Sequence, residues 1–144
     1  MDRINVHFED VNEGDEAPEW KLEDVNRTHF VRYAGASGDF NPLHHDETFA
    51  QKVGFPSVFG HGMFTAGVLS HYVTDWVGVG NLRAYRVRFS KQLWPGDTLT
   101  FKAKVTKKYK ENGENRIDAD LSVTNQKGEP VITGSASAAL PSRG

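Results

Sequence analysis

Residues 62–77 have the sequence GMFTAGVLSHYVTDWV, sixteen positions without a proline. Apolar side chains occupy most faces of the helix that this segment predicts, a pattern typical of a helix buried nearly all round. At about 1.5 Å per residue the helix is roughly 24 Å long, close to the width of a small sheet. We therefore expect one long central helix packed inside a sheet.

The sequence downstream of that helix alternates between apolar and polar residues, as strands with one buried face do. Leu99 and Phe101, for example, alternate with Thr100 and Lys102. Turn sequences separate four predicted strands, at 82–94, 98–109, 116–124 and 129–140. With a further strand near 17–22, the sequence predicts an α+β fold in which a curled antiparallel sheet of about five strands surrounds one long buried helix.

Short helices and irregular turns are predicted upstream of residue 62. A helix is expected at 26–36, because residues able to cap a helix stand at its start. The segment SGDFNPLHHD at 37–46 follows, and its proline disfavours helix at the preceding residue. A brief helix at 47–52 then leads into the loop GFPSVFGHG at 54–62.

The composition is that of one ordinary globular domain, which we expect to cover residues 1–144. Hydrophobic residues make up 38% and charged residues 25% of the chain, so disorder and a coiled coil are both disfavoured. The chain has no cysteine, which excludes disulfides, thiolate metal ligands and a cysteine nucleophile. No apolar run approaches the ~20 residues of a membrane helix, and the first ten residues carry acids where a signal peptide is basic and apolar. We therefore expect a cytoplasmic protein that does not bind membranes.

The net charge of −2 conceals two oppositely charged segments. Residues 1–24 hold nine acids and two bases, whereas residues 82–110 hold nine bases and one acid. A solvated strand face accounts for the basic segment, and so does an anionic ligand bound there, for which Arg86 and Arg88 are the candidate binding residues. No aromatic-studded RNA-binding motif or helix-turn-helix pattern accompanies the charge, so we expect no nucleic-acid partner.

Two stretches of the chain, YAGASGDFNPLHHDETFAQKVGF at 33–55 and VFGHGMFTAGVLSHYVTDW at 58–76, closely resemble the MaoC-like and (R)-specific enoyl-CoA hydratases, which have the hot-dog fold. They are similar as well to the catalytic subunit of the mycobacterial 3-hydroxyacyl-ACP dehydratase. The pattern GDxNPxH followed by HGM is far more specific than a single short motif. The resemblance implies reversible syn addition of water to a trans-2-enoyl thioester of CoA or acyl carrier protein, giving the (R)-3-hydroxyacyl thioester. It also implies a mostly dimeric protein that uses no metal and needs no redox cofactor.

The same resemblance assigns roles to individual residues. The family's catalytic aspartate falls on Asp39 and its histidine on His44, with Asn41 in the turn between them. The backbone amide that binds the thioester oxygen falls on Gly62, and a serine one or two turns along the helix falls on Ser70. Asn41 and Ser70 are therefore candidate substrate-binding residues.

The chemistry of hydration independently favours these positions. The reaction needs a group that takes a proton from water and a group that returns one to the α-carbon, and a His/Asp pair does both. A proline-bent turn lets Asp39 and His44 point to one water, which a regular helix does not allow at a spacing of five. At a helix start, free amides and the positive dipole end stabilise charge on the thioester oxygen, and Gly62 lets a ligand approach the backbone closely.

Each of these residues also has a plainer interpretation. An aspartate in a Gly/Asn/Pro turn often serves only an Asx-turn, and Ser70 fits a bond to the carbonyl four residues earlier nearly as well as it fits a ligand. A metal site at His44, His45 and Asp46 is disfavoured, because adjacent residues rarely converge on one ion. We interpret His45 as a loop residue and His61 as a packed or hydrogen-bonded one, and place neither in catalysis.

The sequence therefore predicts an (R)-specific 2-enoyl thioester hydratase, equivalently a 3-hydroxyacyl thioester dehydratase. We expect a homodimer, or a heterodimer with another hot-dog subunit. Two rivals stay open, a hot-dog acyl thioesterase and a non-catalytic acyl-binding subunit of a heteromeric dehydratase. The motif GDFNPLH disfavours the first and the Asp/His pair disfavours the second, whereas nothing in the sequence chooses between CoA and acyl carrier protein.

Overall fold

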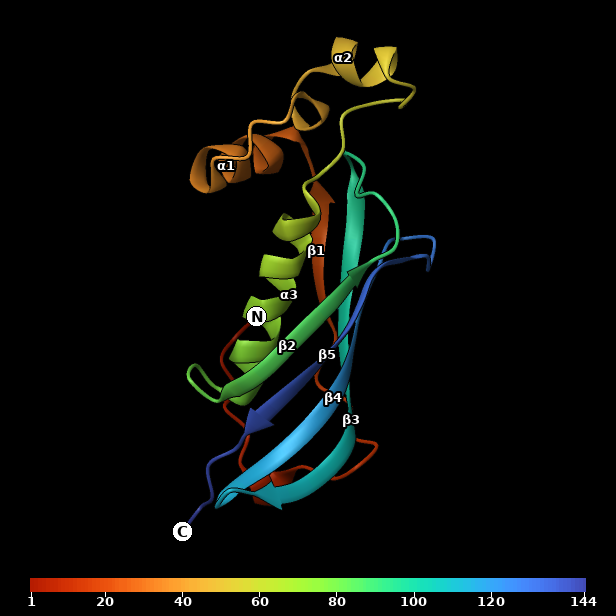
Figure 1. The fold of residues 1–144 in the computed structure, drawn as a ribbon. Helices are drawn as coiled ribbons and strands as arrows, with labels where there is room; N and C mark the ends of the chain where they lie inside the picture. Colours follow the sequence, from red (N-terminus) through yellow and green to blue (C-terminus); the bar gives the residue numbers. More distant parts are fainter.

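Five antiparallel strands form one curled sheet, in the order β1-β3-β4-β5-β2, in the computed structural model, which describes all residues 1–144 (Figure 1). The strands are β1 (Trp20–Val25), β2 (Leu82–Phe89), β3 (Asp97–Glu111), β4 (Glu114–Thr124) and β5 (Pro130–Ala139). The predicted α+β fold and its sheet of about five strands are confirmed. Because β1 and β2 lie at the edges, each has one side without a strand partner.

The long hairpin of β3 and β4 sets the register of the sheet. Its turn residues Asn112 and Gly113 both have positive φ, 52° and 76°, the conformation that two-residue hairpins favour. Phe101 then lies opposite Val123, and alternate residues on both strands face the concave side. The apolar residues on the concave side are buried. The alternation predicted from the sequence therefore places the apolar face of the sheet against the helix.

Helix α3 (Gly62–Val77) packs along the concave face of the sheet, with the bounds that the sequence predicted (Figure 1). The Tyr72 hydroxyl donates to the Pro18 carbonyl at 3.0 Å, beside β1, and the Tyr85 hydroxyl on β2 donates to the Ala66 carbonyl at 2.7 Å. Burial raises the pKa of both tyrosines to about 12. The two bonds tie the helix to both edges of the sheet.

The expectation that α3 is buried nearly all round is wrong for one stripe of the helix. Met63 is 58% exposed, and Gly67 and His71, one and two turns further on, are exposed as well. The sheet covers only one side of the helix, and no other element covers this stripe. None of the helices is long and apolar enough to cross a membrane.

Two predicted strand boundaries also need correction. The strand predicted at 82–94 ends at Phe89, because the Ser90 and Lys91 amides both bond to the Val131 carbonyl and the chain then leaves the sheet. Apolar Leu93 is buried, but in a loop, where its carbonyl accepts a bond from the Gly60 amide at 2.8 Å. The strand expected near 17–22 lies at Trp20–Val25, and only isolated pairing precedes it.

Three short elements lie beyond one end of the sheet, above the start of α3 (Figure 1). They are α1 (Arg27–Ser37), a 3₁₀ turn η2 (Pro42–His44) and α2 (Glu47–Lys52). A further 3₁₀ turn, η1 (Phe8–Asp10), lies near the N-terminus. The Glu47 carboxylate accepts bonds from the Arg27 guanidinium at 3.0 Å and from the Val58 amide at 3.3 Å. One side chain therefore holds together the starts of α1 and α2 and the loop that leads to α3.

Candidate functional site

The turn after α1 is fixed by its own side chains. Helix α1 ends at Ser37 and is capped by Gly38, whose φ of 76° favours glycine. The Asp39 carboxylate accepts a bond from the Asn41 amide at 3.2 Å, and the Asn41 side chain accepts one from the Leu43 amide at 3.0 Å. The Asx-turn interpretation of Asp39 therefore holds, and the second bond makes Asn41 the cap of η2. Asp39 remains exposed, so its carboxylate is also accessible to a ligand.

The ring of His44 is held in one orientation. Its Nδ1 lies 2.6 Å from the Phe59 carbonyl oxygen, and its ring packs edge-on against the Phe59 ring. Because a carbonyl only accepts hydrogen bonds, Nδ1 carries the hydrogen and Nε2 carries the lone pair. His44 therefore offers an acceptor to a water or substrate on the side away from Phe59.

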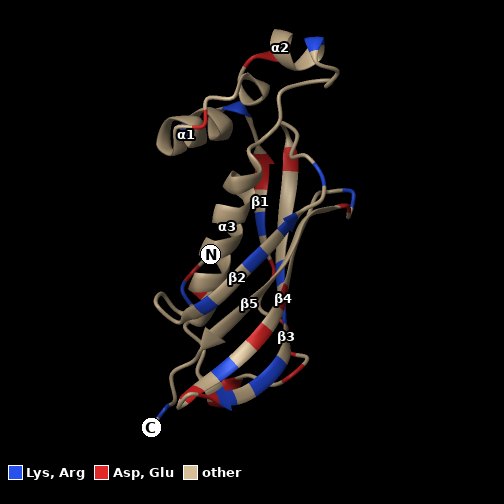
Figure 2. Ribbon diagram, viewed as in Figure 1, with Lys and Arg blue, Asp and Glu red and all other residues tan.

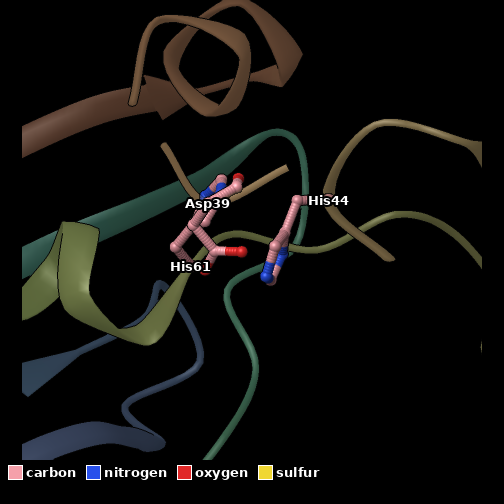
Figure 3. A group of neighbouring side chains, drawn as sticks. All are labelled: Asp39, His44 and His61. Atoms are coloured by element: carbon pink, nitrogen blue, oxygen red, sulfur yellow. The ribbon is translucent and has the colours of Figure 1, made fainter. Parts of the chain in front are cut away.

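His61 lies beside these two residues (Figure 3), although the sequence alone predicts no catalytic role for it. It is 2% exposed, its Nε2 lies 3.0 Å from the Asp39 carbonyl oxygen, and its ring stacks on that of His44 at 3.8 Å and 28°. Burial is the main cause that lowers the pKa of His61, and the bond to the Asp39 carbonyl opposes it. The ring is packed and hydrogen-bonded as predicted. Its place directly before Gly62 in the HGM motif was the one sequence signal of its proximity to the site.

The spacing of the three side chains fits a water molecule. Asp39, His44 and His61 each offer a ligand atom, and these atoms all lie within 4.8 Å of one another. A water that makes two hydrogen bonds of about 2.8 Å at a tetrahedral angle spans about 4.5 Å. The Asp39 carboxylate and a ring nitrogen of His44 are therefore close enough to hold one water between them.

The same three residues fit a metal ion poorly. A metal needs the in-plane lone pairs of its histidine ligands to converge, as in a tetrahedral site. The His44 and His61 rings stack at 3.8 Å with an angle of 28° between their planes, so lone pairs that lie in the two planes do not converge well on one ion. His45 lies outside the group, with its Nε2 3.2 Å from the Phe40 carbonyl oxygen, as expected for a loop residue.

The start of α3 supplies an unused hydrogen-bond donor. Gly62 is the first residue of the helix, and its amide makes no hydrogen bond to any backbone or side-chain acceptor. A β-carbon at this position would lie 2.9 Å from two atoms of the Phe89 ring, so the close approach of that ring requires glycine. The free amide and the positive end of the helix dipole form a site for developing negative charge.

A pocket of about 290 Å³ adjoins the Gly62 amide. Its walls include the apolar side chains of Phe89, Leu93 and Ile132, and its size is close to the lower limit for small-molecule sites. The Phe89 side chain, at the end of β2, lines this pocket. Thr65 lines it too, and its buried hydroxyl has no hydrogen-bond partner. The pocket thus combines an apolar wall with an unpaired polar group.

Three of the predicted binding residues lie apart from this pocket. The Ser70 hydroxyl donates to the Gly67 carbonyl at 2.7 Å, a bond within the helix to the residue three positions earlier. Arg86 and Arg88 pair with Ser135 and Thr133 of β5 and are exposed on the convex face, where basic residues follow β2 (Figure 2). The alternation of β2 sends their side chains away from Phe89 and the pocket.

Comparisons with known proteins cover nearly the whole chain. The family model described as MaoC like domain matches residues 11–127. The chain is 32% identical over 145 residues to the (R)-specific enoyl-CoA hydratase of Rhodospirillum rubrum, an alignment that covers 99% of this chain and 97% of that protein. The chain is also 32% identical over 130 residues to the peroxisomal multifunctional enzyme type 2 of Mus musculus. That alignment covers 88% of this chain and spans only 17% of the mouse protein. The solved R-hydratase PhaJ1 from Pseudomonas aeruginosa, in the unliganded form, superimposes with a TM-score of 0.85 at 26% identity, over 96% of this chain and 88% of that one.

Proposed function

Because the chain belongs to the MaoC-like domain family, we propose that it is an (R)-specific hydratase, which adds water to the double bond of a trans-2-enoyl-CoA. The observation that carries the proposal is that the Asp39 carboxylate and a ring nitrogen of His44 lie within 4.8 Å of each other, within the reach of one bridging water. The unbonded amide of Gly62 supports it, since hydration needs a donor for the thioester oxygen.

The proposed reaction conserves the atoms of one water molecule. The Asp39/His44 pair takes a proton from the water as its oxygen bonds to C3, and returns one proton to C2 from the same side, which makes the addition syn. Negative charge develops on the thioester oxygen between these steps, and the Gly62 amide donates a hydrogen bond to it. Dehydration of the (R)-3-hydroxyacyl thioester follows the same path in reverse.

The pocket beside Gly62 supports an acyl thioester as substrate. A thioester whose oxygen meets the Gly62 amide has its acyl chain or its pantetheine arm within reach of the apolar wall formed by Phe89, Leu93 and Ile132. The basic convex face offers a separate surface for the carrier, which is CoA or acyl carrier protein. Comparing the rates with the CoA thioester and the acyl carrier protein thioester of the same acyl group tests which carrier the protein uses.

We further propose a homodimer, with a heterodimer as the alternative. The open edge of β2 and the exposed stripe of α3 that contains Met63 support it, since a second hot-dog chain would cover both. Sedimentation equilibrium is expected to give twice the 16.1 kDa mass of one chain. A monomer in isolation that forms a complex only with another hot-dog subunit would favour the heterodimer.

One assay separates the proposed hydratase from its rivals. Purified protein is mixed with a trans-2-enoyl-CoA, and the ultraviolet absorbance of the conjugated thioester and the release of free thiol are followed together. Loss of absorbance without thiol, with an (R)-3-hydroxyacyl product, supports the hydratase. Release of thiol would identify a thioesterase, and no change in either signal would identify an acyl-binding subunit.

A further inference from the structure

His61 occupies the N-cap position of α3 but does not cap the helix. Its side chain makes no hydrogen bond to the first-turn amides, whereas Ser, Thr, Asp and Asn are the residues that usually do so. The side chain is nevertheless almost fully buried, at 2% exposure. Because the ring is buried but does not bond to the amides of its own helix, contacts with other segments must hold it in place.

Those contacts are with the Asp39/His44 pair. His61 Nε2 lies 3.0 Å from the Asp39 carbonyl oxygen, so Nε2 carries the hydrogen and donates it. One face of the ring stacks on His44 at 3.8 Å, and Tyr33 of α1 packs against it at 4.8 Å. His61 is also joined by one peptide bond to Gly62, whose amide is the proposed donor to the thioester oxygen.

This arrangement requires a neutral ring. With the hydrogen on Nε2, Nδ1 holds a lone pair, and it is buried without a partner. The titratable groups around the ring are Asp39, His44 and His45 of the turn and Tyr33 of α1, with Lys91 on the loop that lines the same pocket. A second positive charge 3.8 Å from His44 would repel the imidazolium that forms when His44 takes up a proton.

We infer that His61 is a positioning residue: its bond to the Asp39 carbonyl and its stack on His44 hold the acid–base pair in register with the Gly62 amide. The inference rests on the hydratase function proposed above. His61 itself does not exchange a proton with the substrate. It fixes the distance between the groups that do, and an error of about 1 Å in such a distance lowers a rate by about 10²-fold.

Three substitutions of His61 test its Nε2 donor, its Nδ1 acceptor and its stacking on His44 separately. In His61→Gln, the side-chain amide nitrogen can reach the place of Nε2 and donate to Asp39. His61→Asn places a polar atom near Nδ1 but cannot reach Asp39, and His61→Phe keeps only the stacking. His7, which is 39% exposed and lies beside Asp10 near the N-terminus, provides the matched control set His7→Gln, His7→Asn and His7→Phe.

We expect His61→Gln to keep kcat within about threefold, and His61→Asn and His61→Phe to lower it by at least about 10-fold, with KM changed by less than about twofold. Full activity of His61→Phe would overturn the inference, because neither polar atom would then be needed. Activity of His61→Asn combined with inactivity of His61→Gln would also overturn it, because the essential atom would be Nδ1. Circular dichroism establishes that each variant is folded before its kinetics are interpreted.

A second measurement uses the unmodified protein and does not depend on the variants folding. Nitrogen-15 NMR of the histidine rings distinguishes the two neutral tautomers, and we expect His61 to carry its hydrogen on Nε2 at pH 7. A hydrogen on Nδ1, or a charged ring, would overturn the inference. If the parent protein lacks hydratase activity, the proposed function fails while the tautomer result still stands. If the parent is active and all His61 variants match it, only the positioning role fails.

Discussion

The turn that carries Asp39 and His44 and the convex face that carries Arg86 and Arg88 both present charged or titratable groups, but only the turn restrains them. Around Asp39, the carboxylate, the carbonyl and the neighbouring rings each have a fixed partner. Arg86 and Arg88 are exposed and make no ion pair or side-chain hydrogen bond. A reaction needs its catalytic groups held in position. The difference therefore indicates that fixed side-chain positions identify a candidate active site better than charge alone does.

The strongest test of this contrast removes the restrained groups. Asp39→Asn and His44→Ala are each expected to lower kcat by at least ~100-fold, the lower limit for a positioned acid or base. Both residues are on a turn outside the sheet, so the fold should survive, which the far-ultraviolet circular dichroism spectrum checks. A folded Asp39→Asn protein with most of its activity would remove the proposed mechanism.

A smaller effect is expected at the start of α3. In Gly62→Ala the new methyl group meets the Phe89 ring, 2.9 Å from its position, and the shift displaces the amide from the thioester oxygen. We expect kcat to fall by about 10-fold, less than for complete loss of an oxyanion donor. Adding Phe89→Ala should restore part of the rate in the double variant. No recovery would show that the methyl group acts on the substrate directly rather than through the ring.

The convex face is tested by reversing its charge. Arg86→Glu combined with Arg88→Glu is expected to raise KM for the thioester by about threefold or more, to weaken the salt dependence of KM, and to change kcat by less than about twofold. The reason is that these side chains can attract the carrier's phosphates or an acidic carrier protein, yet point away from the pocket. Kinetics at several salt concentrations measure the effect. Unchanged KM at all of them would make the face an ordinary solvated surface.

The pH dependence of stability probes the restraint around His61. Because its pKa in the folded protein lies below the ordinary value of 6.5, the unfolded chain binds a proton at this ring more readily than the folded protein does. The free energy of unfolding should therefore fall as the pH decreases through 6.5. His61→Gln should make this decrease shallower than in the parent protein, in urea titrations between pH 5 and about 7.5. A slope equal to that of the parent protein would contradict a buried neutral His61.

The smallest expected effect is that of metal chelation. The stacked rings of His44 and His61 do not offer well-converging ligands, so incubation with a chelator should leave the initial rate unchanged. The control is the same incubation followed by addition of Zn²⁺, Mg²⁺ or Mn²⁺. Activity that is lost on chelation and restored by one of these ions would reverse the interpretation.

The parts of the fold set by local patterns could be predicted from the sequence. Helix 62–77 and the alternating strands follow from hydrophobic patterns, and helix 47–52 from its place between a turn and a Gly/Pro loop; their bounds or faces agree with the structure. The strand predicted to reach residue 94 stops at Phe89, since Leu93 finds its apolar contacts in a loop. Periodicity does not distinguish burial in a sheet from burial beneath a loop.

In the candidate site, too, local motifs could be predicted from the sequence and long-range contacts could not. Asp39 and His44 are near each other in the chain, and their shared turn could be inferred from the motif. His61 reaches Asp39 across 22 residues, and a contact at that separation depends on how α1 and α3 meet rather than on any local pattern. Ser70 was assigned by position along the helix, but its hydroxyl is satisfied by Gly67 within the helix. Its role in binding remains a prediction without a contact in the pocket.

Because α1, η2 and α2 lie beyond the end of the sheet, we expect them to open more easily than the sheet does. Amides in β3 and β4 exchange with solvent only when the sheet separates, whereas those of residues 38–46 exchange when the short elements lift away from α3. The Glu47 carboxylate links these elements, and its bonds to Arg27 and the Val58 amide hold its pKa below the ordinary value of 4.5. This linkage is present above that pH and is lost as the pH falls through the lowered pKa. We therefore expect the contacts of Glu47 with Arg27 and with the loop at Val58 to weaken in acid while the sheet is still paired.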